Sequence, residues 1–164
     1  MKICLSLLAA LLLSPIAAAA SPTLAPLLGA SDWINTRPTR ADVAGKVVVL
    51  DVFTVDCFNC RNVEPTLREL YAKKHGSGLE IIGIHTPETP AEKQRSYVMA
   101  NLKEQGIVWP VAVDNAFALW DAYGVNAWPT QLFFDRRGHL RKVIVGDSQD
   151  DAVRAEVEAL LAER

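Results

Sequence analysis

Residues 47–60 read VVVLDVFTVDCFNC, in which an apolar run, Val47 to Phe53, is followed by two cysteines separated by two residues. The run is typical of a buried strand, and the residues from Cys57 onward are typical of a helix. If the helix begins near Cys57, the two sulfur atoms lie one turn apart, within the Cα spacing of a disulfide. Cys57 then also faces the free N–H groups and the positive dipole end of the helix, which favour a thiolate. The segment therefore predicts a redox-active pair in which Cys57 is reactive and Cys60 is its resolving partner.

Three other interpretations of the cysteine pair stay open. A purely structural disulfide would stabilise the fold by only about 2 kcal/mol, because the loop that it closes is very short. A zinc site needs about four ligands, and the three histidines, His75, His85 and His139, are not at ligand spacing. Inert buried thiols are the third interpretation, which the strand-to-helix position disfavours. We expect no metal and no other cofactor.

The composition is that of one globular domain. The chain has 164 residues, half of them apolar, and a formal net charge of -2, so it can bury a core of its own. Lys and Arg are scattered along the sequence, and no nucleic-acid partner is expected. No glycine-rich phosphate loop is present in the sequence.

Residues 1–20 have the pattern of a secretory signal peptide. A positive start is followed by a short apolar segment and by three alanines before Ser21, which predicts cleavage near Ser21. An uncleaved anchor is the alternative, although the apolar segment is shorter than the roughly 20 residues that a membrane span needs. We expect an exported, periplasmic protein without a membrane span after cleavage, and its mature form would keep only Cys57 and Cys60.

Strand and helix patterns alternate in the remaining sequence. Residues 21–45 are predicted to be an irregular lead-in, and residues 46–164 the domain. The expected strands are 46–53, 79–85, 107–113, 130–135 and 140–145, and the expected helices are 57–74, 91–105, 115–123 and 150–163. This order predicts an α/β fold with a mixed central sheet and helices on both faces. Sites in such folds form at the carboxyl ends of strands, where Cys57 falls.

Asp51 is the charged residue of the apolar run. Burial should raise its pKa and make it a candidate proton acceptor for Cys60, whereas an Asp at the strand end that reaches solvent is the alternative. Asp56, directly before Cys57, is predicted to cap the helix, although its charge would also oppose a thiolate. His85 is predicted to be a loop histidine with its hydrogen bonds satisfied, or else to border the site.

Several residues together resemble the thioredoxin superfamily. Asp51 lies six residues before Cys57, Pro65 lies five after Cys60, and the triplet 128–130, Trp-Pro-Thr, precedes a hairpin strand. Four segments resemble the exported TlpA-like branch and, within it, the soluble thioredoxin-like domain of DipZ-type proteins. They are residues 32–36, 45–51, 84–88 and 110–115. The resemblance covers about residues 30–150.

The resemblance implies a thioredoxin-like fold and a thiol:disulfide oxidoreductase. Cys57 would attack a substrate disulfide, and Cys60 would then resolve the mixed disulfide. Phe58 and Asn59 occupy the positions that tune the redox potential, but they are not a pair from which the direction of electron flow can be inferred. We expect the protein to reduce or isomerise disulfides rather than to form them.

The triplet 128–130 would contribute the substrate-binding loop. The resemblance implies that Pro129 is a cis-proline beside the disulfide, with Trp128 and Thr130 as its neighbours. Trp128 would either stack over the cysteines or pack under the hairpin. The expected partners are protein thiols and disulfides and a membrane electron donor of the DsbD-like type, and a monomer is expected.

Two other functions are alternatives. Thr54, three residues before Cys57, suggests a thiol peroxidase, although peroxiredoxins have a Pro further upstream where this chain has Leu50. The other alternative is a thioredoxin-like module that binds a client without turnover.

Overall fold

The computed structural model describes residues 21–163, so the predicted signal peptide lies outside the described residues. Six strands form one sheet: β1 (Trp33–Ile34), β2 (Val47–Phe53), β3 (Leu79–His85), β4 (Val111–Val113), β5 (Thr130–Phe134) and β6 (Leu140–Val145). The α-helices are α1 (Ala25–Leu28), α2 (Arg40–Val43), α3 (Phe58–Lys74), α4 (Arg95–Glu104), α5 (Ala118–Ala122) and α6 (Asp150–Ala162). Two short 3₁₀ helices, η1 (His75–Ser77) and η2 (Ala91–Lys93), follow α3 and precede α4.

The sheet is mixed, as predicted. Its strand order is β1-β4-β3-β2-β5-β6. Strands β2, β3 and β4 are parallel, whereas β5, β6 and β1 each pair antiparallel with their neighbours. The carboxyl ends of β2 and β3 therefore lie side by side, with Phe53 paired to His85. The loop after β2 leads directly to Cys57.

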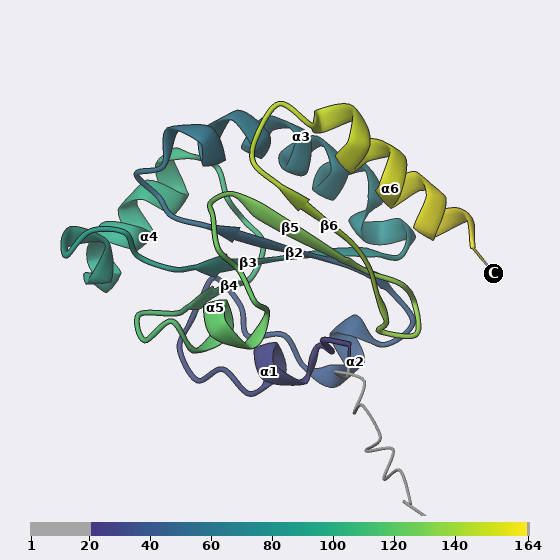
Figure 1. Cartoon of the computed structure of the whole chain (residues 1–164), viewed down its shortest axis with the longest axis horizontal. Helices are drawn as coiled ribbons and strands as arrows, with labels where there is room; N and C mark the ends of the chain where they lie inside the picture. Colours follow the sequence, from purple (N-terminus) through teal and green to yellow (C-terminus); the bar gives the residue numbers. More distant parts are fainter. Residues whose placement is uncertain (1–20, 164) are drawn as a thin grey trace, which may run out of the picture.

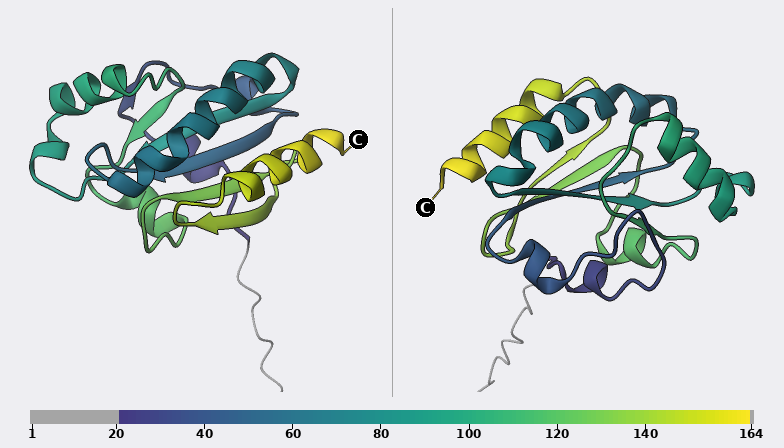
Figure 2. Two further views of the ribbon diagram at one scale, coloured as in Figure 1. Left: turned by 90° about the horizontal axis from the view of Figure 1, so that it is seen from above. Right: turned by 180° about the vertical axis from the view of Figure 1, so that it is seen from behind.

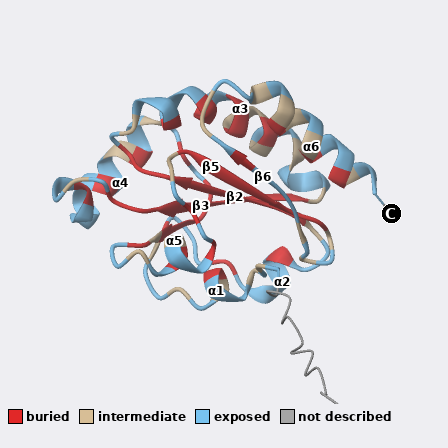
Figure 3. Ribbon diagram, in the orientation of Figure 1, coloured by how far each residue is buried: buried red, intermediate tan, exposed pale blue. Residues whose placement is uncertain are grey.

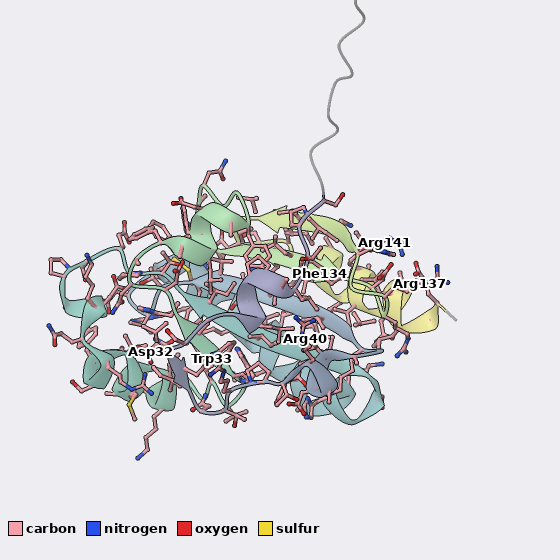
Figure 4. The ribbon with its side chains drawn as sticks, turned by 90° about the horizontal axis from the view of Figure 1, so that it is seen from below. Asp32, Trp33, Arg40, Phe134, Arg137 and Arg141 are labelled. Carbon is pink, nitrogen blue, oxygen red and sulfur yellow. A yellow bond between two sulfur atoms is a disulfide. The ribbon has the colours of Figure 1, made fainter. Side chains whose placement is uncertain are left out.

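Helices cover both faces of the sheet (Figure 1). One core cluster lies between the sheet and α3, α4 and α6, and the other lies between the sheet and α1, α2 and α5. Helices α3 and α6 lie side by side on their face (Figure 2). Figure 4 shows the opposite face, where the buried Phe134 lies near α1. No helix within residues 21–163 is long and apolar enough to cross a membrane.

Strand β2 is buried along its whole length, as Figure 3 shows for the centre of the sheet. Its side chains alternate between the two clusters, because successive residues of a strand point to opposite faces. Val49 and Phe53 belong to the cluster under α3, and Leu50 and Val52 belong to the other cluster. Asp51 alternates with them and therefore faces α3.

The structure corrects several predicted boundaries. The predicted helix 91–105 is divided by the extended backbone of Gln94 into η2 and α4. The predicted strand 107–113 begins only at Val111, after Pro110, which has no N–H to donate. The lead-in 21–45, predicted as irregular, contains α1, β1 and α2, and β1 pairs with β4 at the edge of the sheet.

Candidate active site around the cysteine pair

Cys57 and Cys60 form a disulfide at the beginning of α3, with their Cα atoms 5.3 Å apart (yellow in Figure 4). Cys57 is the N-cap residue, and its Sγ accepts a hydrogen bond from the backbone N–H of Cys60 at 3.1 Å. The prediction that Asp56 caps this helix was therefore wrong, because the sulfur itself occupies the capping position. Cys57 is partly exposed, whereas Cys60 is only 3% exposed. The two cysteines thus differ in access, and a molecule from solvent can reach Cys57 first.

Asp51 is buried on the α3 side of the sheet and is 3% exposed. Its Oδ1 accepts a hydrogen bond of 2.9 Å from the side-chain amide of Gln131, its partner on β5. Burial raises the pKa of Asp51 to about 7; the bond from Gln131 opposes this, and the charge of Glu64 adds to it. The alternative of a solvent-exposed Asp is thereby excluded. A carboxyl group with such a pKa can take up and release a proton near neutral pH.

Glu64, one turn after Cys60 on α3, is a second buried carboxyl group on this side. Its Oε2 lies 3.1 Å from the guanidinium of Arg68. Burial raises the pKa of Glu64, while the charge of Arg68 and its hydrogen bond act in the opposite direction. No sequence pattern gives this residue a role, yet its charge contributes to the raised pKa of Asp51.

The loop before β5 contains the expected cis-proline. The peptide bond between Trp128 and Pro129 is cis. The carbonyl of Pro129 accepts a hydrogen bond from the N–H of Gly146 at 2.8 Å. The hydroxyl of Thr130 donates to the carbonyl of Ala127 at 2.8 Å, and its side chain is buried. Thr130 therefore holds the loop from inside.

Aromatic side chains surround this loop. The ring of Trp128 packs at a tilt of 46° against that of Trp120 of α5, with ring centroids 4.5 Å apart, and Trp120 in turn meets the ring of Phe117 edge-on. Trp128 also packs against the cluster that contains Cys60. Phe58, between the two cysteines, is 75% exposed, and Asn59 is exposed beside it. The surface next to Cys57 is therefore partly aromatic.

Glu92 of η2 is a buried carboxylate that holds the loop before Cys57. One of its oxygens accepts from the hydroxyl of Thr54 and from the N–H of Asp56, the latter at 3.1 Å. The other accepts from the N–H groups of Glu88 and Thr89 at 2.9 and 2.7 Å. Burial alone would raise the pKa of Glu92, but these four hydrogen bonds lower it below its ordinary value.

His85 differs from the prediction. It is the last residue of β3, fully buried, and its ring lies edge-on to Phe53 at 5.8 Å. Neither ring nitrogen has a hydrogen-bond partner within residues 21–163. Burial lowers the pKa of His85 to about 4, against the opposing charges of Glu92 and Asp56. His85 is therefore neutral at neutral pH.

Sequence reasoning did not identify Glu92. It stands in a polar segment where no periodicity or motif distinguishes it from exposed neighbours, and its partner Thr54 is 38 residues away in the chain. A possible signal was its position seven residues after His85, in the loop that follows a strand of the sheet. Within residues 21–163, no three His, Cys, Asp or Glu side chains are grouped so that they could hold a metal ion.

Comparison with solved structures agrees with this description of the fold. The solution structure of a thioredoxin-like protein in the oxidized form superimposes with a TM-score of 0.77 and 25% sequence identity, covering 87% of this chain and 96% of that one. The fold is therefore thioredoxin-like, as the sequence predicted. Residues 23–143 match the model of the AhpC/TSA family, and the chain belongs to this family.

Two relatives illustrate the range of lengths in which such a domain occurs. Protein DipZ of Mycobacterium bovis is 32% identical over 139 residues, which are 82% of this chain and 20% of DipZ. The chain thus spans about a fifth of the length of that relative. Thiol-disulfide oxidoreductase YkuV of Bacillus subtilis is 27% identical over 138 residues, which cover 84% of this chain and 93% of YkuV.

Proposed function

We propose that this chain is an exported thiol:disulfide oxidoreductase that reduces disulfides in client proteins through Cys57 and Cys60. The observation that carries the proposal is the unequal access of the two sulfurs. Cys57 is partly exposed at the start of α3 and accepts the N–H of Cys60, while Cys60 is buried behind it. The similarity to YkuV, a protein named as a thiol-disulfide oxidoreductase, supports the same reaction class.

The reaction moves two electrons from the dithiol to the client. The thiolate of Cys57 attacks one sulfur of the client disulfide, a new bond forms between protein and client, and the other client sulfur leaves as a thiolate. Cys60 then loses its proton and attacks the Sγ of Cys57, which releases the second client thiolate. The pair is left as the Cys57–Cys60 disulfide, and the client has gained two electrons and two protons.

Asp51 is our candidate for the proton acceptor of the second step. It faces α3 from β2, and burial raises its pKa to about 7. Such a group is ionised in part of the molecules at neutral pH and can accept the proton of a buried thiol. When the disulfide is reduced again, the same carboxyl group can return the proton.

The cis-proline loop is our candidate for the client-binding surface. Trp128 packs against the α3 cluster that contains Cys60, Pro129 follows it in the chain, and Thr130 fixes the loop from inside. We assign Phe58 and Asn59 to tuning of the potential, because they form the first turn of α3 between the sulfurs. The exposed ring of Phe58 also offers an apolar contact to a client near Cys57.

A reductase needs a source of electrons. We propose a membrane donor of the DsbD-like type, on the basis of the likeness to DipZ. Two further points of the proposal are that the protein is exported through cleavage near Ser21 and that its mature form is a monomer. Mass spectrometry of the mature N-terminus in a cell fraction outside the cytoplasm and light scattering of the purified protein test these two points.

A trapping experiment tests the function. In Cys60→Ser, the mixed disulfide with the client cannot be resolved, so clients and the electron donor should accumulate as covalent complexes through Cys57. The matched control is Cys57→Ser, which should trap far less because the exposed sulfur is gone. Complexes that survive without reductant and disappear with it support the proposal, whereas equal yields from both variants contradict it.

The two alternative functions, a thiol peroxidase and a binding module, predict different results. The hydroxyl proton of Thr54, the residue behind the peroxidase alternative, is donated to Glu92. Rapid peroxide consumption by the purified protein with a thiol donor would nevertheless favour a peroxidase. A binding module without turnover would hold its clients without a covalent bond, so no reductant would be needed to release them.

A further inference from the structure

The charges around Cys57 are unevenly distributed. Three features favour a thiolate there: the N-terminal end of α3, the N–H of Cys60, and the guanidinium of Arg61, which donates to the carbonyl of Val55 at 3.1 Å. A carboxylate near the same sulfur has the opposite effect, because a like charge disfavours the charged form. Whether the surrounding charges together favour or disfavour the Cys57 thiolate therefore depends on the acidic groups near this loop.

Two carboxylates lie close to the backbone directly before Cys57. One is the side chain of Asp56 itself, which is exposed and accepts hydrogen bonds from the hydroxyl of Tyr97 at 2.9 and 3.1 Å. The other is Glu92, whose oxygen lies 3.1 Å from the backbone nitrogen of Asp56. Glu92 is fully buried, so water screens its charge less than that of a surface residue.

Two further titratable groups, His85 and Asp147, do not offset these charges. His85, which faces the same side of the sheet as Phe53, is neutral at neutral pH. Asp147 accepts a hydrogen bond of 2.6 Å from Asn62 on α3 and adds a further negative charge. Arg61 is the cation that contacts the loop directly, and it is exposed.

We propose that the carboxylates of Glu92 and Asp56 disfavour the thiolate of Cys57 and thereby make the reduced pair a stronger electron donor. This inference rests on the proposed function, since it gives the physical reason for electron flow toward the client. A dithiol whose thiolate is less stable gives up its electrons more readily, as a stabilised reduced form makes an oxidant. Glu92 is in this sense a positioning residue, because it acts on Cys57 through the loop and through its charge.

Glu92 also has an anchoring role, which has to be separated from its charge. Thr54→Val removes one of its hydrogen bonds and keeps the carboxylate. Glu92→Asp keeps the charge on a shorter side chain. Glu92→Gln removes the charge and keeps the size. Asp56→Asn removes the exposed charge and keeps the backbone N–H that Glu92 accepts.

The measurement is the pKa of Cys57 in the reduced full-length mature protein, from the pH dependence of its alkylation rate. Glu92→Gln should lower this pKa by about one pH unit, and Asp56→Asn by about half as much. Thr54→Val and Glu92→Asp should leave it near the wild-type value. In equilibrium with glutathione, Glu92→Gln should favour the reduced protein up to about tenfold, which corresponds to about 30 mV.

Two results would overturn the inference. If Glu92→Gln and Thr54→Val lower the unfolding temperature alike and neither changes the pKa of Cys57, Glu92 is an anchor only. If Glu92→Gln does not fold, Asp56→Asn decides, and an unchanged pKa in that variant rejects the proposed effect of the acidic pair. The proposed function fails separately, when Cys60→Ser traps no client, since the alkylation measurement needs no client.

Discussion

Asp51 in β2 and Glu92 in η2 are both buried carboxyl groups, yet their pKa values are displaced in opposite directions. The pKa of Asp51 is raised to about 7, and that of Glu92 is lowered. From the described part of the chain, residues 21–163, Asp51 accepts one side-chain hydrogen bond, from Gln131, whereas the Glu92 carboxylate accepts four. Both side chains are nearly closed off from solvent. At Glu92 the four hydrogen bonds outweigh the effect of burial on the pKa, whereas at Asp51 the single hydrogen bond does not.

The supply differs because of the backbone around each group. Asp51 lies in the middle of β2, where both neighbouring strands occupy the backbone N–H groups in the ladder. Glu92 lies between two loops, whose N–H groups have no strand partner and converge on its carboxylate. Loops at the carboxyl end of a sheet can therefore hold a buried charge that the adjacent strand cannot.

The largest effect should come from Asp51→Asn. The native pKa lies above the ordinary value of 3.8, so between about pH 4 and 7 the folded protein holds a proton that the unfolded chain has released. Wild-type stability therefore falls as the pH rises through this window and stays constant above it. The difference of about three pH units corresponds to a gain of about 4 kcal/mol for the oxidised variant at about pH 8, measured by urea unfolding.

The gain of Asp51→Asn should shrink toward zero near pH 4, where the wild-type carboxyl group is also neutral. The amide can still accept the hydrogen bond from Gln131, so little geometry is lost. A gain that is the same at both pH values would mean that the charge of Asp51 is not its cause.

Glu92→Gln should have a large effect of the opposite sign. The amide nitrogen of Gln would face N–H donors that now bind a carboxylate, which should cost about 3 kcal/mol at neutral pH. Because the native pKa of Glu92 is lowered, its stabilisation is fully present above the ordinary value of 4.5 and is lost as the pH falls below it. Urea unfolding at neutral pH and near pH 3 measures this, and a loss that does not shrink at low pH would contradict it.

Arg68→Met tests a third buried carboxyl group, Glu64, whose main partner is a single cation. Removing the cation leaves the carboxylate poorly paired, and we expect a loss of about 2 kcal/mol at neutral pH. The loss is smaller than for a fully buried pair because the Arg68 side chain is 38% exposed. The matched control is Lys73→Met, which breaks an exposed pair with Glu69 of the same spacing and should change stability very little. Equal losses in thermal unfolding would show that burial of Glu64 is unimportant.

Thr54→Val should have a smaller effect than these, a loss of about 1 kcal/mol, because three of the four donors to Glu92 remain. Thr130→Val is a suitable comparison, since its buried hydroxyl donates to the neutral carbonyl of Ala127. The bond to a charged acceptor is the stronger, so Thr54→Val should lose more in thermal unfolding. The reverse order would argue that Glu92 is not ionised in the folded protein.

Much of the fold was predictable because its signals are local. The continuous apolar run of β2 and the hairpin around Gly138 depend on residues that are close in the chain. The division of the predicted helix 91–105 was not predictable, because the break at Gln94 follows a turn that packs Glu92 under a distant loop. The pairing of β1 with β4 joins segments that are about 80 residues apart, and no local pattern specifies it.

The amino-acid sequence was sufficient to identify the cysteine pair, its place at a strand-to-helix junction and a carboxyl group within a buried strand. These features lie within one short segment, so local patterns reveal them. The tertiary structure alone decided that Cys57 rather than Asp56 caps α3, that the buried ring of His85 has no hydrogen-bond partner in residues 21–163, and that Glu92 keeps its charge. Desolvation and hydrogen bonding depend on which distant segments are brought together. Which side chains of this site carry a proton at a given pH is therefore decided by the tertiary structure.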